Sequence, residues 1–242
     1  MILLKNQIKT TVAFLIVVSL FSVLVSLGFW QLDRARQKKA MLEQQHQNDS
    51  KPPVLLNQNN TSDIQAFTPV ELEGNWSSEW NFYLDNRIVD GKTGYNVLSL
   101  FVNQNNQAVW VDRGWLVFEN GQRQFHFPPV SALQNRLLGY VHYPGEFNVV
   151  TLPELKPNKL AIMPGIKMSH LVAFFKERGI TLMPFVVRQT FPQSEHGLLR
   201  EWRIVEFPPS RHVGYAVQWF SLSGVLLILS FIQFRKKNKV SK

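Results

Sequence analysis

The residues of this sequence best able to bind a transition metal or a haem iron are its six histidines, because it contains no cysteine. They are His46, His126, His142, His170, His196 and His212. The lack of cysteine rules out a disulfide, a thiolate copper site, covalent attachment of a c-type haem and thiol redox chemistry. A metal or haem would therefore be bound through histidine, methionine or oxygen.

The common catalytic motifs are missing from the sequence. It contains no Walker-type phosphate loop, no H-E-x-x-H zinc motif and no G-x-S-x-G nucleophile elbow. Scattered Ser, His and Asp residues do not make a catalytic triad without the matching geometry. We therefore expect a protein that is not an enzyme, and an exported hydrolase has no motif to support it.

The formal charge of +9 is concentrated at the two ends of the chain. Residues 1–30 and 213–242 contain no acidic side chain, and they carry seven basic ones: Lys5, Lys9, Arg235, Lys236, Lys237, Lys239 and Lys242. The stretch between them is near balance, with 19 basic and 17 acidic side chains. No basic surface is left for DNA or RNA, so we expect no nucleic-acid partner.

Two uncharged apolar segments predict transmembrane helices at residues 10–30 and 213–234. At about 1.5 Å per residue, each is long enough to cross roughly 30 Å of hydrocarbon. A cleaved signal peptide is the alternative for the first, but its apolar core would be shorter, and bulky Phe29 and Trp30 stand where small residues are needed for cleavage. We predict two membrane spans.

The basic residues beside the spans predict the topology. The cluster from Arg235 to Lys237 directly follows the second span and favours a cytoplasmic C-terminus. The first span alone would point the other way, because four basic residues follow it and two precede it. With both termini cytoplasmic, residues 31–212 form a periplasmic domain. No Arg-rich and Ser-rich transit peptide precedes Thr10, which favours a bacterial inner membrane over a mitochondrion.

Residues 31–212 read as a β-rich α+β domain, with an antiparallel sheet or partly closed barrel plus one helix. A polar helical stalk continues from the first span and should stop at Pro52 and Pro53. Residues 103–106 predict a hairpin loop between strands at 97–102 and 108–112. The helix should begin with Ser169 as N-cap and close at Gly179. Strands are expected at 182–190 and 202–207.

Four short motifs carry a resemblance to a known family. They are LGFWQLDR at 27–34, GYNVLSLF at 94–101, VDRGWL at 111–116 and HVGYAVQWF at 212–220. In this order between two terminal spans, they resemble the Surf-type (surfeit locus, Shy-like) family of cytochrome c oxidase assembly factors. The sequence departs from the family pattern at Asp112, where Asn is usual, and in lacking a Pro soon after Trp115.

The resemblance implies an assembly factor for the haem-copper cytochrome c oxidase, which assists haem a delivery to the core subunit or its retention there. The implied partners are the membrane, the oxidase core subunit and haem a synthase, and the implied cofactor is haem a. The alternative is a membrane scaffold that stabilises an assembly intermediate and binds no haem.

Candidate haem contacts lie mostly at the outer ends of the two spans. On a helix, His212, Tyr215, Trp219 and Ser223 fall within about 80° of one another. His212 is the candidate metal ligand, with Tyr215 and Trp219 beside the macrocycle; an aromatic belt at the membrane interface is the alternative.

The remaining candidates are on the first span and in the domain. Ser19, Ser22, Ser26 and Trp30 share one helix face, which suggests a seam against the second span or against a partner's helices. Arg34 and Arg36 could pair with haem propionates or with lipid headgroups. Arg113 could contact a ligand or partner, or it could be a surface residue of a hairpin with a buried Trp.

Overall fold

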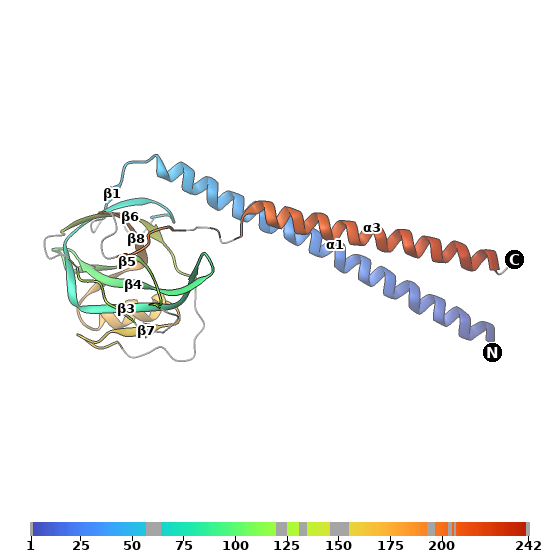
Figure 1. Cartoon of the computed structure of the whole chain (residues 1–242), viewed down its shortest axis with the longest axis horizontal. Coiled ribbons are helices and arrows are strands. Elements are labelled where there is room, and N and C mark those ends of the chain that lie inside the picture. Colours follow the sequence, from blue (N-terminus) through green and yellow to red (C-terminus); the bar gives the residue numbers. More distant parts are fainter. Residues whose placement is uncertain are drawn as a thin grey trace. The chain divides into compact units, whose positions relative to one another are not determined.

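The computed structural model describes residues 2–56, 64–119, 125–130, 135–145, 155–192, 197–202, 205 and 207–240, with side chains within residues 11–236 (Figure 1). The chain divides into two compact units. A helical unit combines residues 1–44 with residues 203–242, and a β-rich unit comprises residues 45–202. Residues 31–44 and 203–212 of the predicted 31–212 domain fall in the helical unit.

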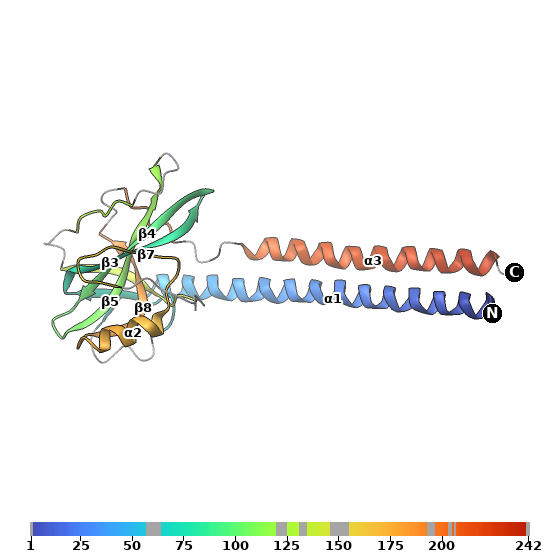
Figure 2. The ribbon, with the colours of Figure 1, turned by 90° about the horizontal axis from the view of Figure 1, so that it is seen from below.

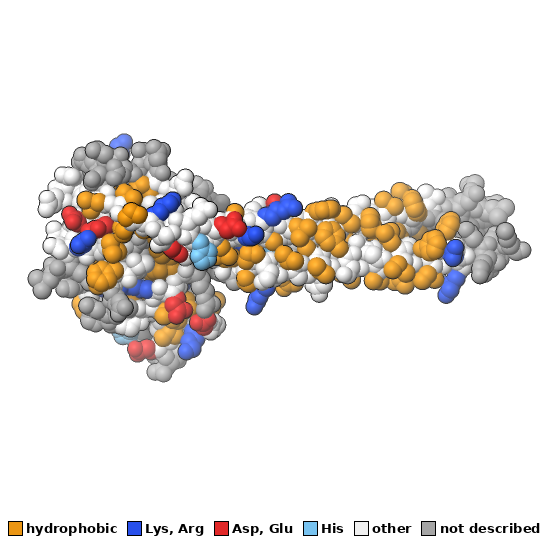
Figure 3. Space-filling view, turned by 90° about the horizontal axis from the view of Figure 1, so that it is seen from above, with side chains coloured by type: hydrophobic (Ala, Val, Ile, Leu, Met, Phe, Trp, Pro, Cys, Tyr) orange, Lys and Arg blue, Asp and Glu red, His pale blue; other side chains and the backbone are white. Residues whose placement is uncertain are grey.

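Two long helices form the helical unit: α1 (Ile2–Asp49) and α3 (Pro209–Val240). The N-terminal part of α1 contains the first predicted span, and α1 ends at Asp49, ahead of Pro52 and Pro53, as the stalk prediction required. Only 6% and 11% of the most apolar windows of α1 and α3 are buried. Figure 3 shows apolar side chains along the described length of this unit, with Lys and Arg near both ends. Because an apolar surface of this kind is unfavourable in water, both helices are candidate membrane spans.

Eight strands form one mixed sheet in the order β1-β2-β6-β8-β5-β4-β3-β7. The strands are β1 (Val54–Leu55), β2 (Pro69–Glu73), β3 (Asn75–Val89), β4 (Lys92–Val102), β5 (Gln107–Val117), β6 (Arg136–His142), β7 (Ala161–Met163) and β8 (Thr181–Phe191). Three neighbouring pairs are parallel, namely β1–β2, β3–β7 and β5–β8. The prediction of an antiparallel sheet was therefore wrong for these pairs, which are joined by long connections that sequence periodicity does not reveal.

The hairpin predicted at residues 103–106 is confirmed. It joins β4 to β5, and the Asn103 N–H donates to the Gln107 carbonyl oxygen at 2.9 Å. Asn106 has a φ of 57°, which Asn tolerates better than most residues. The expected strand positions on either side of this loop are thereby correct.

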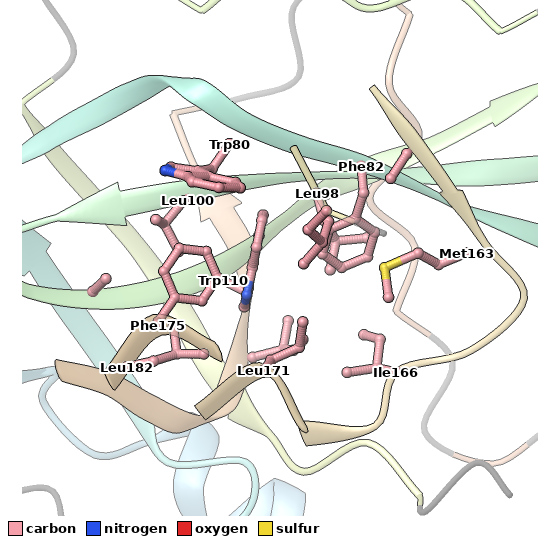
Figure 4. Close-up of a cluster of buried hydrophobic side chains, with 14 of the residues drawn as sticks. Trp80, Phe82, Leu98, Leu100, Trp110, Met163, Ile166, Leu171, Phe175 and Leu182 are labelled. Atoms are coloured by element: carbon pink, nitrogen blue, oxygen red, sulfur yellow. The ribbon is translucent and has the colours of Figure 1, made fainter. Parts of the chain in front are cut away.

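Both faces of the sheet are covered by hydrophobic clusters. Along β5, Ala108 and Trp110 point into the cluster shown in Figure 4, whereas Val109 and Val111 belong to the cluster on the other face. Trp110 is fully buried, and its ring centroid lies 4.5 Å from that of Phe82. Alternating strand residues thus build two cores from one sheet.

One helix, α2 (Met168–Lys176), packs on the sheet through Leu171 and Phe175, beside β8 (Figure 2). Its N-cap is Lys167 rather than Ser169, so that prediction was wrong. Gly179, with a φ of 72°, follows the helix as predicted. The strand expected at 202–207 is not present at the described residues Trp202, Val205 and Phe207; the other positions lie outside the described part.

Candidate functional site

A hydrogen-bonded pair of side chains links the two long helices. His212 lies in the first turn of α3, and its Nδ1 is 2.8 Å from Oε1 of Gln31 on α1. The helices run antiparallel, with both chain termini at the same end (Figures 1 and 2). Sequence reasoning singled out His212 but gave Gln31 no role, although both lie in the motifs at the membrane boundaries.

The helices meet along a seam of regularly spaced residues. The less exposed positions recur every three or four residues, at Leu24, Gly28, Gln31 and Ala35 on α1 and at His212, Ala216, Trp219 and Ser223 on α3. A Cβ atom on Gly28 would come within 2.5 Å of the Phe220 ring. Small seam residues therefore let the backbones approach closely, and this spacing was the sequence signal that could have revealed Gln31.

The serine row predicted as a seam does not pack between the two helices. Ser19, Ser22, Ser26 and Trp30 are exposed on α1, and the Ser22 hydroxyl donates to the Val18 carbonyl oxygen of its own helix. The prediction of a seam with the second span was wrong because Gly28 and Ala35 supply the small residues there. Packing of this row against a partner's helix stays a prediction.

The structure divides the predicted stripe on α3. His212 and Trp219 are half-buried and Ser223 is buried along the seam, whereas Tyr215 is 49% exposed. Tyr215 follows His212 by three residues and so lies about 60° round the helix from it. A ring at this position flanks the seam instead of filling it.

Tyr215 and Arg34 lie on the same side of the helix pair. Arg34 follows Gln31 by three residues on α1, and Tyr215 follows His212 by three residues on α3. Each therefore lies about 60° round its own helix from the hydrogen-bonded residue, in the same sense of rotation. The two helices are antiparallel and face each other. The same rotation about each helix axis therefore brings both side chains to the same side of the helix pair. Trp30, which precedes Gln31, falls further round on that side, while the Phe29 and Phe220 rings meet on the opposite side at 5.3 Å.

Arg34 is held in place by its own helix. Its guanidinium lies 5.6 Å from the Trp30 ring centroid, and Nη1 donates to Oε1 of Gln37 at 2.9 Å. The Gln37 amide in turn donates to Asp33 at 2.8 Å. The side chains of Arg34 and Arg36 are both exposed, so either can reach an anionic group outside the helix pair.

Arg113 is a buried structural residue of the β-rich unit. Its side chain is 5% exposed, and Nη1 and Nη2 donate to the carbonyl oxygens of Pro128 and Pro129 at 2.8 Å each. The guanidinium also lies near the rings of Trp76 and Phe127. The alternative of a surface Arg was wrong. Arg113 belongs to the β-rich unit, whereas the other candidate residues belong to the helical unit.

The residues around Arg113 explain the two central motifs. Gly114 has a φ of 139°, a conformation that other residues rarely adopt. The Trp115 indole donates to the Arg87 carbonyl oxygen at 3.1 Å, and a Cβ on Gly94 would lie 2.6 Å from the Trp115 ring. The Tyr95 hydroxyl accepts from the His126 N–H at 2.9 Å. These motifs therefore build the sheet and the segment packed on it.

The other histidines have different surroundings. His46 and His170 are exposed on helices, His126 is hydrogen-bonded through its backbone, His142 lies in β6, and His196 lies outside the described residues. Among the described residues, no three His, Asp or Glu side chains gather into a metal site. A haem needs fewer protein ligands, because the porphyrin supplies four nitrogens and the protein supplies axial ligands. A single half-buried histidine such as His212 is enough to supply one axial ligand.

Two titratable side chains of the β-rich unit, Asp112 and His142, have strongly shifted pKa values. Burial raises the pKa of Asp112 to about 6, although Arg188 and the hydrogen bond from Asn96, at 2.7 Å, oppose the shift. Burial lowers the pKa of His142 to about 3, and Arg188 and Arg87 add to the shift. Asp112 lies in β5, between the neighbouring strands β4 and β8.

The chain thus combines two apolar terminal helices, both candidate membrane spans, with an inserted β-rich unit and a histidine at the helix contact. The chain belongs to the SURF1 family, whose model matches residues 18–224. It is 27% identical over 235 residues to a SURF1-like protein of Rickettsia felis, covering 92% of this chain and 96% of the relative. It is 27% identical to one of Rickettsia conorii, covering 90% and 88%, and 22% identical to one of Rickettsia prowazekii, covering 93% and 90%.

Proposed function

We propose that this protein is an assembly factor for haem-copper cytochrome c oxidase that holds haem a at the outer ends of its two membrane helices. The SURF1 family is associated with cytochrome c oxidase assembly, which supports the general role. The observation that carries the finer role is the His212–Gln31 contact, because it occupies Nδ1 of the imidazole and leaves Nε2 for an iron.

Further residues of the helical unit have roles in this proposal. Bound haem a would supply the iron and the macrocycle that oxidase maturation requires. Tyr215 and Trp219 would contact the ring, and Trp30 would cover it from α1. Arg34 would pair with a propionate through charge-assisted hydrogen bonds, whereas Arg36 lies about 160° round α1 from Arg34 and is left out. Arg113 is omitted because its guanidinium is engaged with carbonyl groups.

The proposed location is a bacterial inner membrane, with both termini in the cytoplasm and the β-rich unit in the periplasm. Arg235, Lys236 and Lys237 support this topology. Alkaline phosphatase fused after residue 120 should be active, and the same enzyme fused after Lys242 should be inactive. The reverse pattern would contradict the topology. The proposed partners are the oxidase core subunit and haem a synthase, and the role is binding rather than catalysis.

A scaffold that binds no haem is the second candidate. The exposed row of Ser19, Ser22 and Ser26 favours it, because small residues allow close packing with a helix of a partner. In this case the protein would stabilise an assembly intermediate through helix contacts alone.

An absorbance spectrum of the full chain, purified from a host that makes haem a, separates the two functions. A Soret band with haem near one equivalent per chain is the result expected of a haem-holding factor. A haem-free protein that still restores oxidase assembly would support the scaffold instead. Restored assembly is measured as oxidase activity in membranes of a host that lacks its own factor.

A further inference from the structure

The contact between Gln31 and His212 has a chemical consequence for the imidazole. A neutral imidazole carries its proton on one ring nitrogen and a lone pair on the other, and the hydrogen-bond partner selects which. In this structure Nδ1 faces the carbonyl oxygen of the Gln31 amide at 2.8 Å. An amide oxygen only accepts, so Nδ1 must carry the proton and Nε2 must carry the lone pair.

The surroundings keep both partners in place. Gln31 and His212 are both half-buried on the seam, one turn of helix from Gly28 and Ala216 respectively. The hydroxyls of Ser22 and Ser223 donate to carbonyl oxygens of their own helices. The Gln31–His212 hydrogen bond, in contrast, joins α1 to α3.

We infer that Gln31 is the positioning residue of the site: it fixes the Nδ1–H tautomer and the ring orientation of His212, so that Nε2 is presented to a haem iron. The inference rests on the proposed function for the iron, whereas the tautomer is a property of the protein itself. Histidines that bind metals commonly donate their other N–H to a carbonyl or carboxylate oxygen, which orients the ring and raises its basicity.

Two substitutions distinguish the role of Gln31 as a hydrogen-bond acceptor from a role in helix packing alone. Gln31→Met keeps a similar length and volume but removes the acceptor. Gln31→Glu keeps an acceptor and removes the amide donor. Gln218→Met is the matched control, because Gln218 is an exposed residue of the same helix pair.

Nitrogen NMR on full-length protein with 15N-labelled histidine reads the tautomer directly in lipid, without haem, and His212→Asn identifies the His212 signals. We expect protonated Nδ1 and unprotonated Nε2 in the parent and in Gln218→Met, a protonated Nδ1 also in Gln31→Glu, and a shift toward Nε2–H in Gln31→Met. A parent in which Nε2 carries the proton would overturn the inference, because the Gln31 amide would then act as donor.

The haem a content of each variant, after purification from a haem-a-producing host, measures how the loss of the Gln31 hydrogen bond affects haem binding. Loss of the orienting partner should lower retention about tenfold or more in Gln31→Met, with Gln218→Met equal to the parent. Gln31→Glu should retain haem and shift its midpoint potential downward, since a carboxylate makes the imidazole a stronger donor. Equal retention and potential in all variants would overturn the positioning role.

Helix pairing must be followed in the same variants. The chain has no cysteine, so Gly28→Cys combined with Phe220→Cys reports the α1–α3 contact through oxidative cross-linking. Cross-linking in Gln31→Met should match that of the parent pair. If cross-linking and haem are lost together, Gln31 is a packing residue and the inference fails. If the tautomer is as inferred but the parent holds no haem, the proposed function fails and with it the iron part of the inference.

Discussion

The β-rich unit and the helical unit bury their side chains very differently. In the β-rich unit, Trp110, Phe82 and Phe175 are fully buried and lie in a cluster that covers one face of the sheet. In the helical unit only 6% and 11% of the apolar windows are buried. The β-rich unit completes its core from its own residues, whereas the two long helices leave most of their apolar side chains exposed.

The family motifs divide between the units in the same way. The central motif residues Tyr95, Arg113 and Trp115 are buried, and their polar atoms bond within the β-rich unit. The boundary residues Trp30 and Tyr215 are about half exposed. We conclude that the sheet motifs serve folding and that the helix motifs are the place to look for binding.

Removal of a core ring should have the largest effect on the stability of the β-rich unit. Trp110→Ala removes a fully buried indole in ring contact with Phe82 and Phe175. We expect a loss of about 3–5 kcal/mol in the free energy of unfolding. Chemical denaturation of the full chain in detergent, followed by near-UV circular dichroism, measures it. A loss below about 1 kcal/mol would show that this cluster does not carry the stability of the sheet.

A single added methyl group should have the next largest effect. In Gly114→Ala the new Cβ would lie 3.0 Å from both the Leu198 Cβ and the Leu199 carbonyl oxygen, on a backbone with a φ of 139°. We expect a loss of about 1–3 kcal/mol. The same denaturation experiment checks it, with Gly145→Ala as the control, because a Cβ there meets nothing within 4 Å.

The pH dependence of stability should show two opposing contributions. Asp112 has a raised pKa of about 6 in the folded protein, so its contribution to the free energy of unfolding falls as pH rises from about 4 to 6. His142 has a lowered pKa of about 3, so its contribution falls as pH drops from about 6.5 towards 3. Between pH 4 and 6 the two should nearly cancel.

Single substitutions should reveal each contribution. Relative to the parent, Asp112→Asn should lose stability as pH falls from 6 to 4, and His142→Asn should gain it. Each slope is limited to about 1.4 kcal/mol per pH unit for one proton. Denaturation of both variants at pH 4, 5 and 6 tests this, and identical slopes would show that the two groups do not titrate as assigned.

A substitution in the helix seam should leave the β-rich unit unchanged. Gly28→Leu places a large side chain where a Cβ already meets the Phe220 ring at 2.5 Å, so it should force α1 and α3 apart. We expect an unfolding free energy of the β-rich unit within about 0.5 kcal/mol of the parent. Oxidative cross-linking between cysteines placed at Gln31 and His212, whose side chains lie 2.8 Å apart in the parent, measures the pairing. Unchanged cross-linking would contradict the close seam.

Much of this division could be predicted from the sequence, and the reasons for the misses are physical. The length of the uncharged segments 10–30 and 213–234 predicted the two long helices, and Pro52 correctly predicted where the stalk ends. Parallel pairing such as β5–β8 was missed because long-range register leaves no local pattern. The burial of Arg113 was missed because its partners are backbone carbonyls of a distant segment. Gln31 was missed because its role depends on a residue 181 positions away.

The most direct test of the central claim is the haem a content of His212→Ala, measured from the Soret band per chain after purification from a haem-a-producing host. The site lies at a helix contact outside the sheet core, so the variant should insert and accumulate like the parent. We predict that His212→Ala retains little haem a, while His170→Ala, which removes an exposed histidine from α2, retains the parental amount. Equal haem content in His212→Ala and the parent would contradict the account.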